Sequence, residues 1–144
     1  KIFIDSNNFL EIEGDEFTPV GIFNITKLYY RKDRVELPNI AINKKIIRRT
    51  MGWSDDSKSK TYNKEIKIKK KIHHEKLFRK DYKYDYLLVL DYNKKSTPYK
   101  GSAIFLHLTK DYKPTKGCIT IQKKDFEILL KVIEKKKKIK IKIS

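Results

Sequence analysis

A histidine and the single cysteine of the chain flank one short polar loop, and together they could form a nucleophile and its base. His107 lies in an apolar, strand-like run, and Cys118 follows a loop that ends in Gly117. A thiol becomes a nucleophile when a base takes its proton and rigid flanking segments aim the sulfur. Gly117 permits a tight turn, so that a carbonyl group could approach the backbone amides of Gly117 and Cys118 as an oxyanion hole.

Both residues also have an ordinary structural interpretation. A lone cysteine is commonly a small buried hydrophobe, and a lone histidine in an apolar strand is commonly a core residue whose hydrogen bonds are satisfied. The loop at residues 114–117 favours the functional interpretation, because Pro114, Thr115 and Gly117 form turns well and pack poorly in a core. Residue chemistry alone leaves both interpretations open.

The elements that must position this pair are predicted to be mostly strands. Alternating or continuous apolar runs predict strands at residues 20–30, 40–47, 66–69, 84–92, 102–108 and 119–121. The run at residues 87–90 is continuously apolar, which predicts a buried central strand. The alternating residues 139–143 predict an edge strand whose lysines discourage further pairing.

Two helices are expected. Residues 122–134 place Phe126, Leu129, Leu130 and Ile133 at helical spacing, with acidic Asp125 near the start, so an amphipathic helix late in the chain is predicted. A second, shorter helix is predicted at residues 74–79. The apolar stripe of the late helix indicates core packing.

The cysteine segment resembles the catalytic motif of the L,D-transpeptidase (YkuD-type) domain, and in particular its short, domain-only branch. The resemblance rests on Gly101-Ser102-Ala103-Ile104-Phe105 before His107 and on Pro114-Thr115 before Gly117-Cys118. Further blocks match upstream in the same order: Glu13-Gly14-Asp15, Thr18-Pro19-Val20-Gly21-Ile22-Phe23, Tyr30-Arg31-Lys32-Asp33-Arg34, Gly52-Trp53-Ser54-Asp55-Asp56, Tyr62-Asn63, His74-Glu75-Lys76-Leu77, Tyr84-Asp85 and Asp91-Tyr92-Asn93. Together they span about residues 11 to 135.

The resemblance implies a mainly β, mixed β-sandwich-like catalytic domain with one late α-helix, formed by residues 1–144. It implies cysteine-dependent acyl transfer on peptidoglycan stem peptides, as an L,D-transpeptidase or L,D-carboxypeptidase. Cys118 would form a thioester, His107 would act as the base, and Gly117 would contribute to the oxyanion hole. The expected substrate-binding residues are Thr115, which would also brace the loop, and Trp53, Tyr62, Asn63 and His74. No cofactor and no metal are expected.

Two positions depart from the family pattern. Lys116 stands where many members carry a histidine, which leaves His107 as the local base. Thr120 stands where many members carry an arginine that contacts a substrate carboxylate. The second departure affects the substrate preference more than the chemistry.

Composition excludes several classes of protein. One cysteine rules out an intramolecular disulfide framework and a four-cysteine zinc site. No apolar run reaches the 18 or more residues of a membrane span.

Adjacent His73 and His74 point different ways and make a poor metal site. Asp55 and Asp56 beside Trp53 could form a carboxylate pair for acid–base chemistry on a sugar, although an Asp pair more commonly caps a turn.

The net charge of +17 favours an anionic partner and is the main argument for a different function. Lysines are spread through nearly every segment, whereas proteins that read bases favour arginine. We therefore expect that the protein does not bind a specific nucleic acid. The alternative function is that of a non-enzymatic basic module, which binds nucleic acid or an anionic cell-wall polymer. The expected setting is a monomer in the bacterial cell envelope or periplasm, with no export signal visible in this chain.

Overall fold

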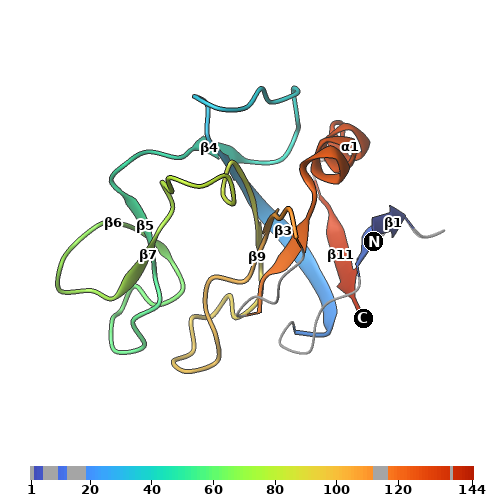
Figure 1. The fold of residues 1–144 in the computed structure, drawn as a ribbon. Coiled ribbons are helices and arrows are strands. Elements are labelled where there is room, and N and C mark those ends of the chain that lie inside the picture. The colour runs from blue at the N-terminus through green and yellow to red at the C-terminus, as the bar shows by residue number, and fades with distance from the viewer. Residues whose placement is uncertain (1, 5–9, 13–18, 112–116, 137) are drawn as a thin grey trace.

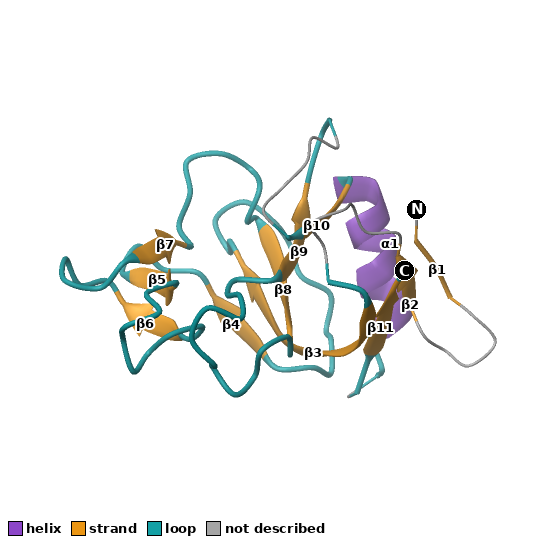
Figure 2. Cartoon of the chain, turned by 90° about the horizontal axis from the view of Figure 1, so that it is seen from below, coloured by secondary structure: helices purple, strands orange, loops and turns teal. Residues whose placement is uncertain are grey.

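The part of the chain that the structure describes is mainly β, with 32% strand and 9% helix, two sheets and a single late helix. The computed structural model describes residues 2–4, 10–12, 19–111, 117–136 and 138–144. The two sheets and the helix form successive layers, with the larger sheet between the smaller sheet and the helix (Figures 1 and 2). The predicted fold class is confirmed.

The larger sheet has eight strands, in the order β1-β2-β11-β3-β8-β9-β10, with β4 beside β3. The bounds are β1 (Ile2–Ile4), β2 (Leu10–Ile12), β3 (Gly21–Tyr30), β4 (Lys44–Ile46), β8 (Tyr86–Leu90), β9 (Phe105–Leu108), β10 (Ile119–Ile121) and β11 (Lys140–Ile143). Strand β3 is the longest, and its register shifts between Ile25 and Lys27. The first part of β3, residues 21–24, pairs with β11, and the part from Ile25 to Tyr30 pairs with β8, so one strand joins the two halves of the sheet.

The two faces of strands β8 and β9 belong to different cores. Leu88 and Leu106 belong to the core between the larger sheet and α1. Leu87 and Phe105 belong to the core between the larger sheet and the smaller sheet. This division follows from the alternation of side chains along a strand. All five residues of β8 are buried, which confirms the predicted central strand.

The only helix in the described residues is α1 (Lys123–Ile133), which agrees closely with the helix predicted at residues 122–134. Its buried residues are the four at helical spacing, Phe126, Leu129, Leu130 and Ile133. No helix among the described residues is both long and apolar enough to span a membrane.

The smaller sheet has the order β6-β5-β7, with β5 (Met51–Ser54), β6 (Glu65–Lys67) and β7 (His74–Lys76). The helix predicted at residues 74–79 is wrong, because residues 74–76 pair antiparallel with β5. Leu77, which follows, is fully buried, and Phe78 packs under the Arg31 guanidinium at 3.6 Å. Pairing and burial override the weak local helix signal here.

The position of the last strand also differs from its prediction. Strand β11 pairs with β2 on one side and with β3 on the other, so it is an interior strand and the predicted edge strand is wrong. Its buried residues, Ile141 and Ile143, alternate with exposed Lys140 and Lys142. Alternation shows which face of a strand is buried, but it does not show how many neighbours the strand has.

Candidate functional site

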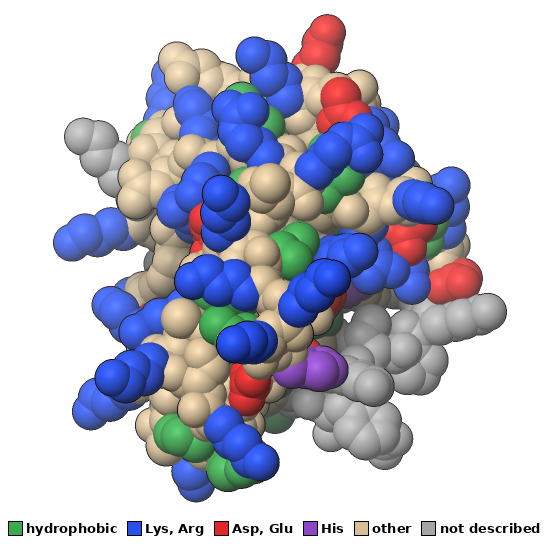
Figure 3. Space-filling model, turned by 90° about the vertical axis from the view of Figure 1, so that its left-hand side faces the viewer, with side chains coloured by type: hydrophobic (Ala, Val, Ile, Leu, Met, Phe, Trp, Pro, Cys, Tyr) green, Lys and Arg blue, Asp and Glu red, His purple; other side chains and the backbone are tan. Residues whose placement is uncertain are grey.

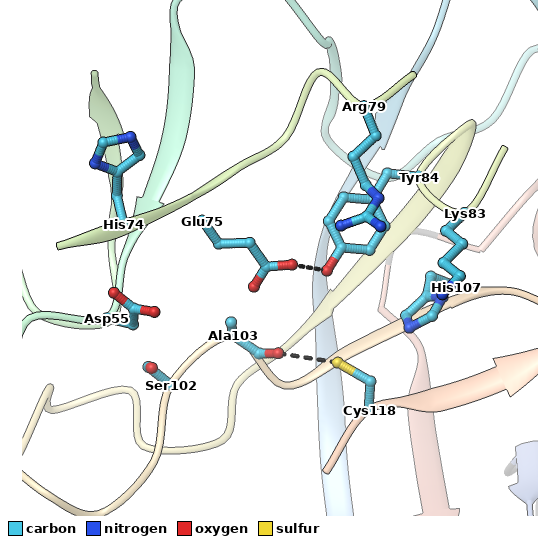
Figure 4. A pocket seen from close by; sticks show the side chains of 10 residues that line it. All are labelled: Asp55, His74, Glu75, Arg79, Lys83, Tyr84, Ser102, Ala103, His107 and Cys118. Carbon is cyan, nitrogen blue, oxygen red and sulfur yellow. Dashed lines mark hydrogen bonds between the residues drawn. The ribbon is translucent and has the colours of Figure 1, made fainter. Parts of the chain in front are cut away.

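Strands β9 and β10 bring His107 and Cys118 to one face of the larger sheet. They pair in parallel, with Ile119 opposite Leu106 and Thr120 opposite His107. Because side chains alternate, Cys118, one residue before β10, lies on the same face as His107. Both side chains line a cavity of about 720 Å³ between the two sheets, and Figure 4 shows them among the residues that line it.

The His107 ring is held in one tautomer. Its Nδ1 lies 3.0 Å from the carbonyl oxygen of Leu108. A carbonyl can only accept a hydrogen bond, so Nδ1 carries the proton and Nε2 is left as the basic nitrogen. Burial lowers the pKa of His107 to about 4, and the nearby charges of Lys83 and Arg79 lower it further, against the opposing Leu108 bond. The ring is therefore neutral at pH 7, with a lone pair available.

The Cys118 thiol is held on its other side by the loop before β9. Its Sγ donates to the carbonyl oxygen of Ala103, at 3.1 Å. Ala103 has φ of 56°, in the left-handed region that a non-glycine residue adopts at a cost of about 1 kcal/mol. Gly117, buried directly before the cysteine, has φ of 98°, which glycine tolerates best. The backbone on both sides of the thiol is thus in uncommon conformations.

Asn63 holds the loop that positions Ala103. Its Oδ1 accepts hydrogen bonds from the Ala103 amide at 3.1 Å and from Trp53 Nε1 at 3.0 Å. Its Nδ2 donates to the carbonyl oxygens of Tyr92 at 3.1 Å and Asn93 at 3.0 Å. One side chain from the loop after β5 therefore fixes both ends of the 92–103 loop.

The predicted substrate-binding residues fall into three groups. His74 lines the cavity. Trp53, Tyr62 and Asn63 are not among the residues that line it: Trp53 and Tyr62 are buried, and the Tyr62 hydroxyl accepts from the Gly101 amide at 3.1 Å. Thr115, like Lys116, lies outside the described residues. Substrate contact by these residues stays a prediction.

Two carboxyl side chains line the cavity. Asp55 lies on the far side of Ala103 from the thiol, and the Glu75 carboxyl points toward Tyr84 (Figure 4). The Tyr84 hydroxyl donates to Glu75 Oε1, and burial raises the pKa of Glu75 despite that bond. The Tyr84 ring also packs edge-on against the His107 ring, with centroids 5.3 Å apart.

The sequence analysis gave no site role to Arg79, Lys83 and Tyr84, which line the cavity beside His107. These residues precede β8, in a segment without regular secondary structure. Strand alternation would place Tyr84 on the face of Tyr86, yet the two belong to opposite cores. The backbone turns at residues 83–84, so the alternation of strand residues does not continue there. The sequence pattern therefore could not predict which side chains line this side of the cavity.

The other clusters noted in the sequence have local partners. Asp56 Oδ1 accepts from the Lys58 amide at 3.1 Å, which is the turn-capping role expected of an Asp pair. Asp55 pairs with the exposed ring of His73. Within the described residues, no three His, Cys, Asp or Glu side chains are grouped so that they could hold a metal ion.

The comparisons with known proteins give one match. The family model of the L,D-transpeptidase catalytic domain, YkuD, matches residues 11–141. No curated protein and no solved structure matches the chain significantly.

Proposed function

The chain belongs to the YkuD family of L,D-transpeptidase catalytic domains, and from that premise we propose that it performs cysteine-dependent acyl transfer on peptidoglycan stem peptides. The family is one of L,D-transpeptidases, whose members usually act on the cell wall outside the cytoplasm. The observation that best supports the proposal is the pairing in one cavity of the Cys118 thiol with an imidazole whose Nε2 is basic.

In the first half-reaction the Cys118 sulfur attacks the carbonyl carbon of the third stem residue. His107 Nε2 takes the thiol proton as the carbon–sulfur bond forms. The same imidazolium then gives this proton to the nitrogen of the terminal D-amino acid as the carbon–nitrogen bond breaks. The products are a thioester on Cys118, a free D-amino acid and a neutral His107.

In the second half-reaction an amine or a water molecule attacks the thioester. His107 Nε2 accepts a proton from the attacking group and returns it to the sulfur, which leaves as the thiol. An amine acceptor gives a new peptide cross-link, and water gives a shortened stem. The proton balance is the same in both cases, so one imidazole serves both outcomes.

The surroundings of His107 set the form of the base. Its pKa of about 4 keeps the ring neutral at pH 7, and the same burial makes Nε2 a weaker base than a free imidazole. The backbone amides of Gly117 and Cys118 are the proposed donors to the oxyanion of each tetrahedral intermediate. Gly117 has φ of 98°, a conformation that glycine adopts readily because it has no side chain.

The basic charge of the chain does not by itself favour the alternative, a non-enzymatic binding module. On the face shown in Figure 3, Lys and Arg side chains are dispersed over the whole surface, with no continuous track for a polymer. A dispersed cationic surface instead favours a general attraction to the anionic cell wall. The cell envelope or periplasm is accordingly the proposed site of action.

The test combines a natural donor and a covalent probe. The purified protein is incubated with a stem tetrapeptide, with and without an amine acceptor, and separately with a carbapenem, and intact masses are recorded. We expect an acyl-enzyme, a released D-amino acid, and an adduct of one carbapenem per chain. Absence of all three would overturn the proposal. The ratio of cross-linked to shortened product then shows whether the added amine or water is the preferred acceptor.

A further inference from the structure

We propose that Arg79 and Lys83 bind the free carboxylate of the D-amino acid that leaves, so that the donor must carry its scissile bond directly before its C-terminus. The inference rests on the proposed acyl transfer and adds the residues that select the donor. Both side chains line the cavity on the His107 side (Figure 4).

The chemistry limits where this carboxylate can lie. The leaving nitrogen must come within hydrogen-bond distance of His107 Nε2, which protonates it. In an amino acid the carboxyl carbon is only about 2.5 Å from that nitrogen, two bonds away. The carboxylate of a C-terminal residue is therefore confined to the His107 side of the thiol. In a longer donor this position holds a peptide carbonyl, which carries no net charge.

Arg79 is held beside His107 by two contacts. Its guanidinium carbon lies 5.1 Å from the centroid of the Tyr84 ring, which in turn packs against the His107 ring. Asp81 binds Nε at 2.8 Å and Nη2 at 2.7 Å. Among the described residues Nη1 has no hydrogen-bond acceptor, so Arg79 is oriented but keeps one donor for a ligand.

Lys83 supplies the second cation. It is exposed, its Nζ makes no ion pair with the described residues, and its charge acts on His107 from close by. Thr120, which lies opposite His107 in the sheet, is uncharged. Of the described residues that line the cavity, Arg79 and Lys83 are thus the permanent cations. Asp81 pairs with Arg79 and the charge of Glu75 also acts on Arg79, so Lys83, which makes no ion pair with the described residues, is the cation left for a carboxylate.

Negative charge on the other side of the cavity disfavours binding of the donor in the reverse orientation. Asp55 lines the cavity there, beyond Ala103 from the thiol, whereas the Glu75 carboxyl is bonded to Tyr84 (Figure 4). A carboxylate bound beside Asp55 would meet like charge or force a carboxyl to stay protonated. The charges therefore orient the donor, with its C-terminus toward Arg79 and Lys83.

The experiment compares two donors that differ only at this group: a stem tetrapeptide with a C-terminal carboxylate and the same peptide as its C-terminal amide. We expect the wild-type protein to favour the carboxylate in kcat/KM by about 10- to 100-fold, the factor associated with hydrogen bonds to a charged group. Lys83→Met and Arg79→Met should each reduce this ratio, and the double variant should bring it close to 1. The rate with the amide donor is the control for indirect effects on His107. A change at His107 would alter the rates with both donors equally, whereas a loss of carboxylate binding would alter only the rate with the carboxylate donor.

Lys76→Met is the matched control. Lys76 is an exposed lysine of β7 that does not line this cavity, so the variant loses the same charge and should keep the wild-type ratio. Should Arg79→Met fold poorly after losing its Asp81 pair, Lys83→Met still gives the test, because the Lys83 side chain is exposed.

Three results would overturn the inference: equal use of the two donors by the wild type, an unchanged ratio in Lys83→Met and in the double variant, or an equal loss in Lys76→Met. In each of these cases the acyl-enzyme still forms, so the proposed function stands. If neither donor nor a carbapenem acylates Cys118, the proposed function fails, and the inference fails with it.

Discussion

The two sheets contribute different things to the cavity. The larger sheet carries the reacting pair on neighbouring parallel strands, so the positions of His107 and Cys118 follow from one backbone register. The smaller sheet and its loops supply His74 and Glu75 as lining, and Asn63 as a support that fixes the loop of Ala103. The residues that react and the residue that supports the loop therefore belong to different parts of the fold. At pH 7, substitutions in the pair should affect rate with little effect on stability, and substitutions in the support should do the opposite.

The largest effect is expected at the nucleophile. Cys118→Ala should abolish acyl transfer and the carbapenem adduct, while the free energy of unfolding changes by about 1 kcal/mol or less, because one half-buried sulfur is lost. Cys118→Ser is the sharper test, since a hydroxyl stays protonated beside a single histidine, and activity should fall by several orders of magnitude. Intact mass and urea unfolding check both. Retained activity in the serine variant, or an unfolded alanine variant, would make Cys118 a structural residue.

Replacement of the base should have the next largest effect on rate. His107→Gln keeps a side chain of similar size that can donate to the Leu108 carbonyl, but it removes the basic nitrogen. We expect kcat to fall by about 10²- to 10⁴-fold, the usual contribution of a general base. Single-turnover acylation by a carbapenem measures this directly. A variant within tenfold of the wild type would show that another group takes the thiol proton.

The same residue should make stability depend on pH. The folded-state pKa of about 4 lies below the ordinary value of 6.5, so the unfolded chain binds more protons between these two pH values. The His107 contribution is therefore lost as pH falls from about 6.5 to about 4, up to about 3 kcal/mol. Urea unfolding at pH 7 and pH 4 should show a larger loss for the wild type than for His107→Gln. Parallel losses in the two proteins would contradict the lowered pKa.

The support should respond in the opposite way to the pair. Asn63→Ala removes four hydrogen bonds and places alanine at φ of 57°, so we expect a loss of about 3 kcal/mol in the free energy of unfolding. Asn43→Ala, at an exposed asparagine, is the control and should stay within about 0.5 kcal/mol of the wild type. If Asn63→Ala is as stable as the control, the separation of chemistry and support is wrong.

The smallest effect concerns the surface as a whole. Dispersed lysines should give only weak, sequence-independent binding to nucleic acid that collapses as salt rises. Fluorescence anisotropy with two unrelated oligonucleotides at 50 and 200 mM salt measures it. A salt-resistant, sequence-selective complex would instead support the basic binding module.

The sequence predicted best where one local pattern decides the structure. The helix was predicted because four apolar residues recur at helical spacing, and the buried strand β8 because its apolar run is continuous. The sequence predicted less well where distant partners decide: residues 74–79 pair with β5 instead of forming a helix, and β11 lies inside the sheet rather than at its edge. Arg79 and Lys83 reach the cavity from an irregular segment, and irregular backbone carries no period to read.

The surroundings of Trp53 have an optical consequence. It is the single tryptophan of the chain, it is 8% exposed, and its ring meets Phe105 of β9 edge-on, with centroids 5.2 Å apart. Its indole N–H donates to the same Asn63 oxygen that holds Ala103. Tryptophan fluorescence of the protein therefore comes from Trp53 alone. Its ring lies next to the loop whose Ala103 carbonyl contacts the thiol. Intrinsic fluorescence should report movement of that loop when Cys118 is acylated, without any added label.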